Sequence, residues 1–301
     1  MSILHHEVIA APAAGAPRAG PVPSRAGAVP SRAGAVPSRA GASPPRQMLL
    51  LHGIYGAGRN WGSVARRLVG VRPEWSIVLV DLRSHGRSPR LDPHTVEACA
   101  DDLLRLEAHL GRAADAVLGH SFGGKVALLH ARRRAKGPGA VGPSQLWIVD
   151  SAPGAGRPGG GAWRMLGVLR RHPGPFGSRA EAVAAVEGEG YSPLVANWMA
   201  MNAVRGEEGW GWRVDPDEME AYLRDYFRVD AWDVAESPPS GTTVHFVKAL
   251  GSSVLDEEDV ARIRRAGRRT GRVVLHEAEG GHWLNTENPA AIRALLAGEM
   301  R

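Results

Sequence analysis

From residue 48 onward, short continuous apolar runs alternate with segments in which apolar residues recur at helical spacing. A strand that is apolar on both faces must be covered on both faces, as in a parallel sheet flanked by helices. The pattern therefore predicts an α/β fold with a mostly parallel, doubly wound sheet. The expected strands are 48–51, 77–80, 116–118, 146–149, 244–247 and 273–275, and the expected helices are 60–69, 93–110, 123–133 and 289–297.

The interval 154–240 interrupts this alternation. It begins with a glycine-rich stretch, continues with mostly helical patterns and contains five of the nine tryptophans. An inserted helical cap accounts for it, so we expect core segments at 48–153 and 241–301 with a cap at 154–240. The cap tryptophans are expected either to line an apolar pocket or to form a small core of their own. The aromatic residues chosen as candidate pocket residues are Tyr55, Trp198 and Trp283.

A proline- and glycine-rich repeat precedes the core. Residues 23–43 contain the unit Pro-Ser-Arg-Ala-Gly-Ala-Val three times, with Ser43 as the one substitution. Such a unit forms neither an apolar stripe nor a core, so disorder is predicted for 11–47. If residues 1–10 form a first strand, the repeat is an inserted loop, which is the interpretation we favour. The alternative is that the N-terminal segment is an organelle transit peptide. In that case we expect the protein in mitochondria or plastids, and otherwise in the cytoplasm.

Composition excludes several classes of function. Five arginines and one glutamate give the first 47 residues a charge of +4, which leaves +2 of the total +6 for the rest. That value gives no reason to expect nucleic-acid binding by the folded part. No apolar run is long enough for a transmembrane helix, and a single cysteine excludes an internal disulfide. Neither a cofactor motif nor a metal-ligand spacing is present, so no cofactor and no metal is expected.

The strongest local motif is Gly119-His120-Ser121-Phe122-Gly123, which lies between an expected strand and an expected helix. The pattern G-x-S-x-G in that context is a nucleophile elbow, a sharp turn that exposes the serine at the carboxyl edge of a sheet. Small residues at its two ends let the strand and the helix approach each other closely. Ser121 is therefore the candidate nucleophile.

A serine hydroxyl needs a neighbouring base to attack at neutral pH. His282 is the candidate, because it follows the last strand and a pair of glycines that let its loop bend. The developing oxyanion needs fixed backbone N–H donors. We expect these at Phe122, which follows the nucleophile, and at Ile54, in the glycine-containing loop after strand 48–51.

The acid that orients the histidine is less clearly marked. Asp150 ends strand 146–149 at the carboxyl edge of the sheet, beside the elbow strand, and is the favoured candidate. Asp256 lies at an expected helix start, where the helix dipole favours acids. A cap acid such as Asp217 is the third candidate. The loop after strand 244–247, where this arrangement often carries the acid, has Ser252 instead.

Several motifs together resemble one family. They are Leu50-Leu51-His52-Gly53, the segment 80–88, Gly119 to Lys125, Val149-Asp150-Ser151, Gly281-His282-Trp283 and Trp212-Arg213-Val214. Across residues 48–297 the chain resembles the α/β-hydrolase domain-containing protein 11 family and its small bacterial esterase relatives. The resemblance implies an α/β-hydrolase fold, ester hydrolysis through an acyl-enzyme, Asp150 as the acid and Ser252 as a support of the histidine.

The leading hypothesis is a serine hydrolase that cleaves small-molecule carboxylic esters or thioesters. Acyl transfer and carbon–carbon bond hydrolysis by the same three residues remain open, whereas a serine nucleophile argues against dehalogenase or epoxide hydrolase chemistry. From a different class, a binding protein on a catalytically retired hydrolase fold is the alternative. A large separation between Asp150 and His282 would favour that alternative. The sequence leaves the acyl-chain length and the oligomeric state open.

Overall fold

The apolar runs of the core form one sheet in the computed structural model, which describes residues 2–12, 45–137 and 139–301. Within the described residues the sheet has seven strands in the order β1-β3-β2-β4-β5-β8-β9. Only β1 is antiparallel to its neighbour, which confirms the predicted mostly parallel sheet. The strands are β1 (His6–Ala10), β2 (Arg46–Leu51), β3 (Trp75–Val80), β4 (Ala116–His120), β5 (Gln145–Val149), β8 (Thr243–Ala249) and β9 (Val273–Ala278).

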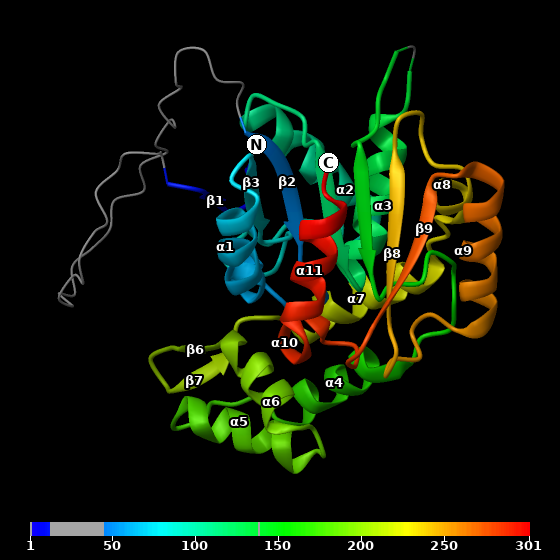
Figure 1. Cartoon of the computed structure of the whole chain (residues 1–301). Helices are drawn as coiled ribbons and strands as arrows, with labels where there is room; N and C mark the ends of the chain where they lie inside the picture. The colour runs from blue at the N-terminus through cyan, green and yellow to red at the C-terminus, as the bar shows by residue number, and fades with distance from the viewer. Residues whose placement is uncertain (1, 13–44, 138) are drawn as a thin grey trace.

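Helices cover both faces of the sheet (Figure 1). On one face α1 (Gly62–Val71) packs against α11 (Pro289–Glu299), and both contribute to a buried cluster with β2 and β3. On the other face lie α2 (Val96–His109), α3 (Phe122–Arg134), α8 (Trp232–Glu236) and α9 (Glu257–Thr270). The short segments η1 (Gly58–Trp61) and α10 (Leu284–Glu287) complete the core. The doubly wound fold is thus confirmed.

In the sequence the cap lies between β5 and α8, and in Figure 1 it lies below the sheet. Its elements are α4 (Gly160–Arg171), α5 (Arg179–Gly188), α6 (Pro193–Met199), η2 (Ala200–Asn202), β6 (Ala203–Arg205), β7 (Trp210–Trp212) and α7 (Pro216–Arg228). Two details of the expected cap 154–240 need correction. The segment contains the antiparallel pair β6–β7 as well as helices, and α8 packs on α3 and α9, so α8 belongs to the core.

The N-terminal segment contributes the first strand, as residues 1–10 suggested. β1 pairs antiparallel with β3, with Val8 opposite Val78. The predicted C-terminal boundary of the disordered stretch 11–47 is wrong, because β2 already begins at Arg46. The Gln47 N–H donates to Asp115 Oδ2 at 2.7 Å. The repeat itself lies outside the described residues. No helix in the described part of the chain is long and apolar enough to cross a bilayer.

Candidate active site

Ser121 lies on the turn between β4 and α3, in a backbone conformation that is rare for a residue with a side chain. Its φ is 52° and its ψ is −119°. The surrounding structure holds this strained turn, because the Ser121 N–H donates to Val149 O at 2.9 Å and the Ser121 carbonyl accepts from Gly124 N–H at 2.8 Å. This is the conformation that a nucleophile elbow requires.

The glycines of the motif are needed for close packing around the serine. A Cβ atom at position 119 would lie 2.0 Å from the carbonyl oxygen of Gly123, and one at position 123 would lie 2.5 Å from that of His52. Neither contact is sterically allowed, and both involve backbone atoms that cannot move aside. The G-x-S-x-G spacing therefore follows from the packing of β4, α3 and the loop after β2.

The structure brings together the three residues that the sequence selected. His282 Nε2 is 3.0 Å from Ser121 Oγ, and His282 Nδ1 is 2.7 Å from Asp150 Oδ2. Asp150 is fully buried, and its other oxygen accepts from the Ala249 N–H at 3.2 Å. One carboxylate oxygen is therefore held by the backbone, and the other contacts the imidazole ring. Such a chain can orient the ring and stabilise a positive charge on it.

The other candidate acids have different roles. Asp256 caps the N-terminus of α9, where it accepts from the Asp259 N–H at 2.8 Å. Asp217 lies on α7 with an 89% exposed side chain and pairs with Arg170 at 2.7 Å. Neither contacts His282, so among the three candidate acids Asp150 alone has a hydrogen bond to His282.

The expected contact between Ser252 and the histidine is not made. Ser252 Oγ accepts from the Val254 N–H at 3.2 Å and, among the described residues, has no hydrogen bond to His282. Its loop reaches the histidine loop through the backbone instead, where the Gly251 N–H donates to Gly280 O at 2.9 Å. The short turn at 252–254 directs the hydroxyl toward its own backbone, which is a common use of serine in loops.

The two expected oxyanion donors flank the serine. Phe122 starts α3, so its N–H has no partner within the helix, as for every first-turn N–H. The loop after β2 lies directly against the nucleophile, since a Cβ at Gly53 would be 3.2 Å from Ser121 Cβ. Within the described residues, neither the Ile54 N–H nor the Phe122 N–H donates to another protein group. Both are therefore free to donate to a substrate oxygen.

Two histidines, His120 and His52, fix these loops through hydrogen bonds to the backbone. His120 Nε2 donates to the carbonyl of His282 at 2.7 Å, which positions the backbone of the candidate base. Burial and the nearby charge of His282 lower the pKa of His120 to about 3. His52 accepts from the Leu82 N–H at 3.0 Å and donates to Gly53 O at 2.7 Å. The bond from the Leu82 N–H requires that His52 Nε2 carry no proton, so the His52 ring is neutral in this arrangement.

We predict that acid destabilises the fold through its buried histidines, which include His85 as well as His120. Burial, and then the charge of His52, lower the pKa of His85 to about 3, well below the value of about 6.5 expected in the unfolded chain. The unfolded state then binds more protons between these values, so stability falls as the pH drops below 6.5. The loss is about 1 kcal/mol per pH unit for each such histidine.

Urea unfolding between pH 7 and pH 5 measures this loss. His85→Asn keeps a donor for the Arg83 carbonyl, which His85 Nδ1 contacts at 2.8 Å, and removes the titrating ring. The variant should show a shallower pH dependence by about one proton. Identical slopes for the wild type and the variant would contradict the prediction.

A small cavity lies over Ser121 and His282, between the core and the cap. Its free volume is about 20 Å³, which is room for about one water molecule. Its walls combine the elbow, the cap and the loop after β2, residues 52–57, which we call the oxyanion loop because it carries the candidate donor Ile54. All three expected pocket residues, Tyr55, Trp198 and Trp283, belong to the lining. The other lining residues are Gly53, Ile54, His120, Ser121, Gly161, Ala162, Met165 and His282. The sequence had not singled out Met165 or the start of α4, because nothing in a glycine-rich run marks it as a cavity wall.

Aromatic residues form the roof of this cavity. The rings of Trp198 and Trp283 lie 5.9 Å apart and join α6 of the cap to the histidine loop. Tyr55 donates its hydroxyl proton to the Ala162 carbonyl at 2.9 Å, which ties the oxyanion loop to α4. The cap thus encloses the candidate site directly.

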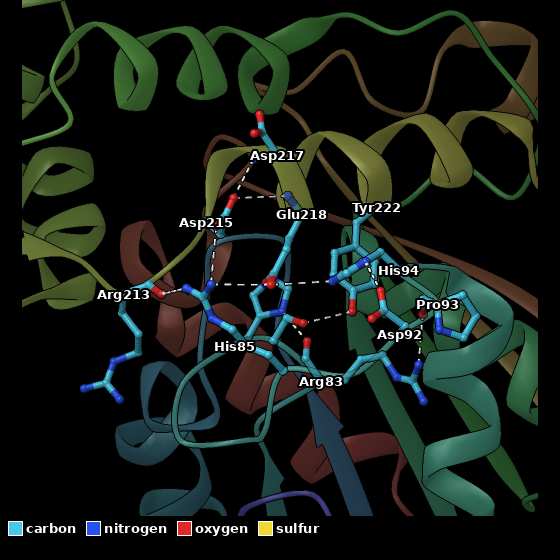
Figure 2. Close-up of polar contacts among 12 residues, drawn as sticks. Arg83, His85, Asp92, Pro93, His94, Arg213, Asp215, Asp217, Glu218 and Tyr222 are labelled. Carbon is cyan, nitrogen blue, oxygen red and sulfur yellow. Dashed lines mark hydrogen bonds and ion pairs between the residues drawn. The ribbon is translucent and has the colours of Figure 1, made fainter.

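Polar contacts fasten α7 of the cap to the core loop that follows β3 (Figure 2). His94 lies between Asp92, at 3.1 Å, and Glu218 of α7, at 3.7 Å. The Tyr222 hydroxyl donates to Ser84 Oγ at 3.4 Å. These contacts place α7 beside the loop that carries residues 83–94.

Lys125 fastens both ends of the cap to α3, four residues after Ser121. Its Nζ donates to the carbonyls of Gly154, Tyr226 and Val229 at 2.8, 2.7 and 3.0 Å. Gly154 precedes the first cap helix, and Val229 follows the last one. Burial lowers the pKa of Lys125 to about 8. A single buried ammonium group therefore holds the base of the cap.

We predict that Lys125→Met lowers the free energy of unfolding by about 3 kcal/mol, because it leaves three carbonyl acceptors without a donor. Lys136→Met is the matched control, because Lys136 is exposed just beyond the end of α3. That control should change stability by less than about 0.5 kcal/mol. Thermal and urea unfolding measure both changes. Equal stability of the Lys125 variant and the wild type would show that the clamp does not hold the cap.

The sheet, the strained serine turn and the inserted cap define the class of α/β-hydrolase folds. The chain belongs to the alpha/beta hydrolase family, whose profile matches residues 48–295. It is 26% identical over 247 residues to sn-1-specific diacylglycerol lipase ABHD11 of Mus musculus, covering 80% of this chain and 76% of that protein. It is 28% identical over 263 residues to Lipase LipV of Mycobacterium tuberculosis, covering 85% and 94%.

Among solved structures, a marine microorganism esterase superimposes with a TM-score of 0.74 and covers 99% of each chain at 21% identity. This likeness concerns the fold. The family resemblance expected from the sequence motifs is confirmed by these comparisons.

Proposed function

We propose that this protein is a serine hydrolase that cleaves carboxylic ester or thioester bonds through an acyl-enzyme on Ser121. The observation that carries the proposal is the hydrogen-bonded chain Ser121–His282–Asp150, with distances of 3.0 and 2.7 Å. A retired fold would have no need to keep these three groups aligned at a strained turn. The two relatives named above as lipases support ester bonds as the target.

In the proposed first step, Ser121 Oγ attacks the acyl carbonyl and His282 Nε2 accepts the hydroxyl proton. Asp150 stabilises the imidazolium and keeps the ring in the tautomer whose Nε2 can act as a base. The tetrahedral oxyanion accepts hydrogen bonds from the Ile54 and Phe122 N–H groups. His282 then returns the proton to the leaving alcohol or thiol, and the carbonyl re-forms as the acyl ester of Ser121.

In the second step, water replaces the leaving group. His282 removes a proton from the water, the hydroxide attacks the acyl-enzyme, and the same two N–H groups hold the second oxyanion. Collapse of this intermediate returns the proton to Ser121 and releases the carboxylic acid. Each residue performs the same task in both halves of the reaction.

The small size of the cavity indicates that the rearrangement needed for entry increases with the length of the acyl group. A free volume of about 20 Å³ beside Ser121 accommodates very few heavy atoms. Longer chains require Trp198 and Trp283 to separate, which moves α6 away from the histidine loop. We therefore expect acetyl and butyryl esters to be hydrolysed with higher kcat/KM than palmitoyl esters.

A p-nitrophenyl ester series from acetate to palmitate, with acetyl thiocholine as a thioester, tests the proposal. We expect saturable hydrolysis of the short esters, with an initial burst of nitrophenol where deacylation is the slower step. Folded protein that hydrolyses none of these compounds, oxygen esters and thioester alike, would contradict the proposed function.

A further inference from the structure

A second cavity lies where the cap meets the core, and residues at the end of the oxyanion loop and the start of η1 contribute to its lining. Its free volume is about 130 Å³, well above the roughly 15 Å³ that one water molecule needs. Residues 53–55 line the cavity over the serine, whereas residues 57–59 line this one. The full lining is His5, Glu7, Ala57, Gly58, Arg59, Leu79, Asp81, Gly86, Arg87 and Arg213.

Three arginines from separate segments converge on this space, which we call the arginine cavity. Arg59 comes from η1, Arg87 from the loop after β3, and Arg213 from the cap. Figure 2 shows the Arg213 side chain extending away from the cluster around His94 and Glu218. Its Nη1 donates to the Gly86 carbonyl at 2.9 Å, which leaves its other N–H groups for a ligand. The Arg87 side chain is engaged in no hydrogen bond with the described residues and is exposed.

The acids of the lining compensate only part of this charge. Asp81 is buried, and its two oxygens accept from the backbone N–H groups of Gly58 and Arg87 at 2.7 and 2.8 Å. Three arginines against Asp81 and Glu7 leave a net charge of +1 on the lining. Partial burial, and then the positive charges of Arg213, Arg179 and Arg87, lower the pKa of Arg59 despite the opposing charge of Asp81. The positive charges of these guanidinium groups therefore repel one another.

We propose that the arginine cavity is a binding site for a phosphate group, either as inorganic phosphate or as the phosphate of an organic monoester. Guanidinium groups match phosphate and carboxylate oxygens by charge and by hydrogen-bond geometry. Here the three groups approach from three different segments. A tetrahedral group with several terminal oxygens can accept from all three, whereas a planar carboxylate has two oxygens. The bound group would neutralise the mutual repulsion of the arginines.

The site also connects the cap with the oxyanion loop. Arg213 belongs to the cap, and Arg59 follows Ile54 by five residues and donates to the carbonyl of Met201 in the cap. A phosphate that accepts from both would tie the cap to this loop. We therefore expect the ligand to raise the thermal stability of the folded protein by mass action.

Calorimetric titration and thermal unfolding with inorganic phosphate, at constant ionic strength and against chloride, test the proposal on the full chain. We expect saturable binding and a phosphate-dependent rise in Tm. Arg87→Ala should weaken binding about tenfold or more, because it removes a charge-assisted contact. Arg67→Ala removes the same charge from an exposed position on α1 and should leave the phosphate affinity unchanged.

A parallel titration with glycerol 3-phosphate distinguishes the two sources of the group. Tighter binding of this monoester, still dependent on Arg87, assigns the site to an organic phosphate, and weaker binding assigns it to the free ion. No binding of either ligand at millimolar concentration would overturn the proposal, as would equal weakening by Arg67→Ala. The readout is independent of Ser121, so failure here would leave the proposed hydrolase function intact.

Discussion

Ser121→Ala is expected to lower kcat for ester hydrolysis by roughly 10⁶-fold, while the fold and its stability are preserved. The reason is that, in the part of the chain that the structure describes, Ser121 Oγ is the one hydroxyl hydrogen-bonded to His282 Nε2, at 3.0 Å. In a comparable serine protease, removal of the nucleophile alone costs about that much, and the remaining rate comes from the oxyanion donors and binding. Steady-state kinetics with p-nitrophenyl acetate measure the change.

Ser252→Ala is the matched control for this prediction. Family resemblance gave Ser252 a supporting role, but its hydroxyl accepts only from the Val254 N–H within the described structure. We therefore expect kcat/KM within about threefold of wild type, which corresponds to less than about 1 kcal/mol of transition-state stabilisation. A loss of activity in Ser252→Ala comparable to that in Ser121→Ala would contradict the geometry.

Asp150→Asn is expected to lower kcat by about 10⁴-fold. The amide keeps the shape of the side chain, but its contact with His282 Nδ1 no longer fixes a proton on that nitrogen. The ring then presents the wrong tautomer to Ser121, and no carboxylate stabilises the imidazolium. The same assay measures the effect, and the affinity for a competitive inhibitor should change far less than kcat.

Asp256→Asn and Asp217→Asn test the two acids that the sequence had left open. Asparagine caps a helix about as well as aspartate, so the Asp256 variant should keep both stability and activity. The Asp217 variant loses only an exposed ion pair, which is worth less than about 1 kcal/mol. If either of these variants lost activity to the extent expected for Asp150→Asn, the assignment of the acid would be wrong.

Much of this architecture could be predicted because its signals are local. The apolar runs of β2, β3 and β4 are buried on both faces, and that burial makes them continuous in sequence. The elbow glycines are required by contacts within a few ångströms of the backbone. His282 was identifiable because a loop after the last strand must end near the same sheet edge as the serine.

The remaining features depend on contacts between distant segments, which leave little local pattern. Lys125 occupies a helix position that could equally face solvent, and only the fold places three carbonyls around its ammonium group. α8 follows the cap directly in sequence, and it belongs to the core only because of its tertiary contacts with α3 and α9. The direction of the Ser252 hydroxyl depends on a single turn, which composition does not determine.

The central claim, that Ser121 is the acyl-accepting nucleophile activated by His282, is tested most directly by covalent labelling. A fluorophosphonate probe should add one phosphonyl group to the wild type, and peptide mass spectrometry should place it on Ser121. Ser121→Ala should not be labelled, and His282→Ala should be labelled at least about 10³-fold more slowly. Labelling of Ser121→Ala at the wild-type rate, or no labelling of folded wild-type protein, would contradict the account.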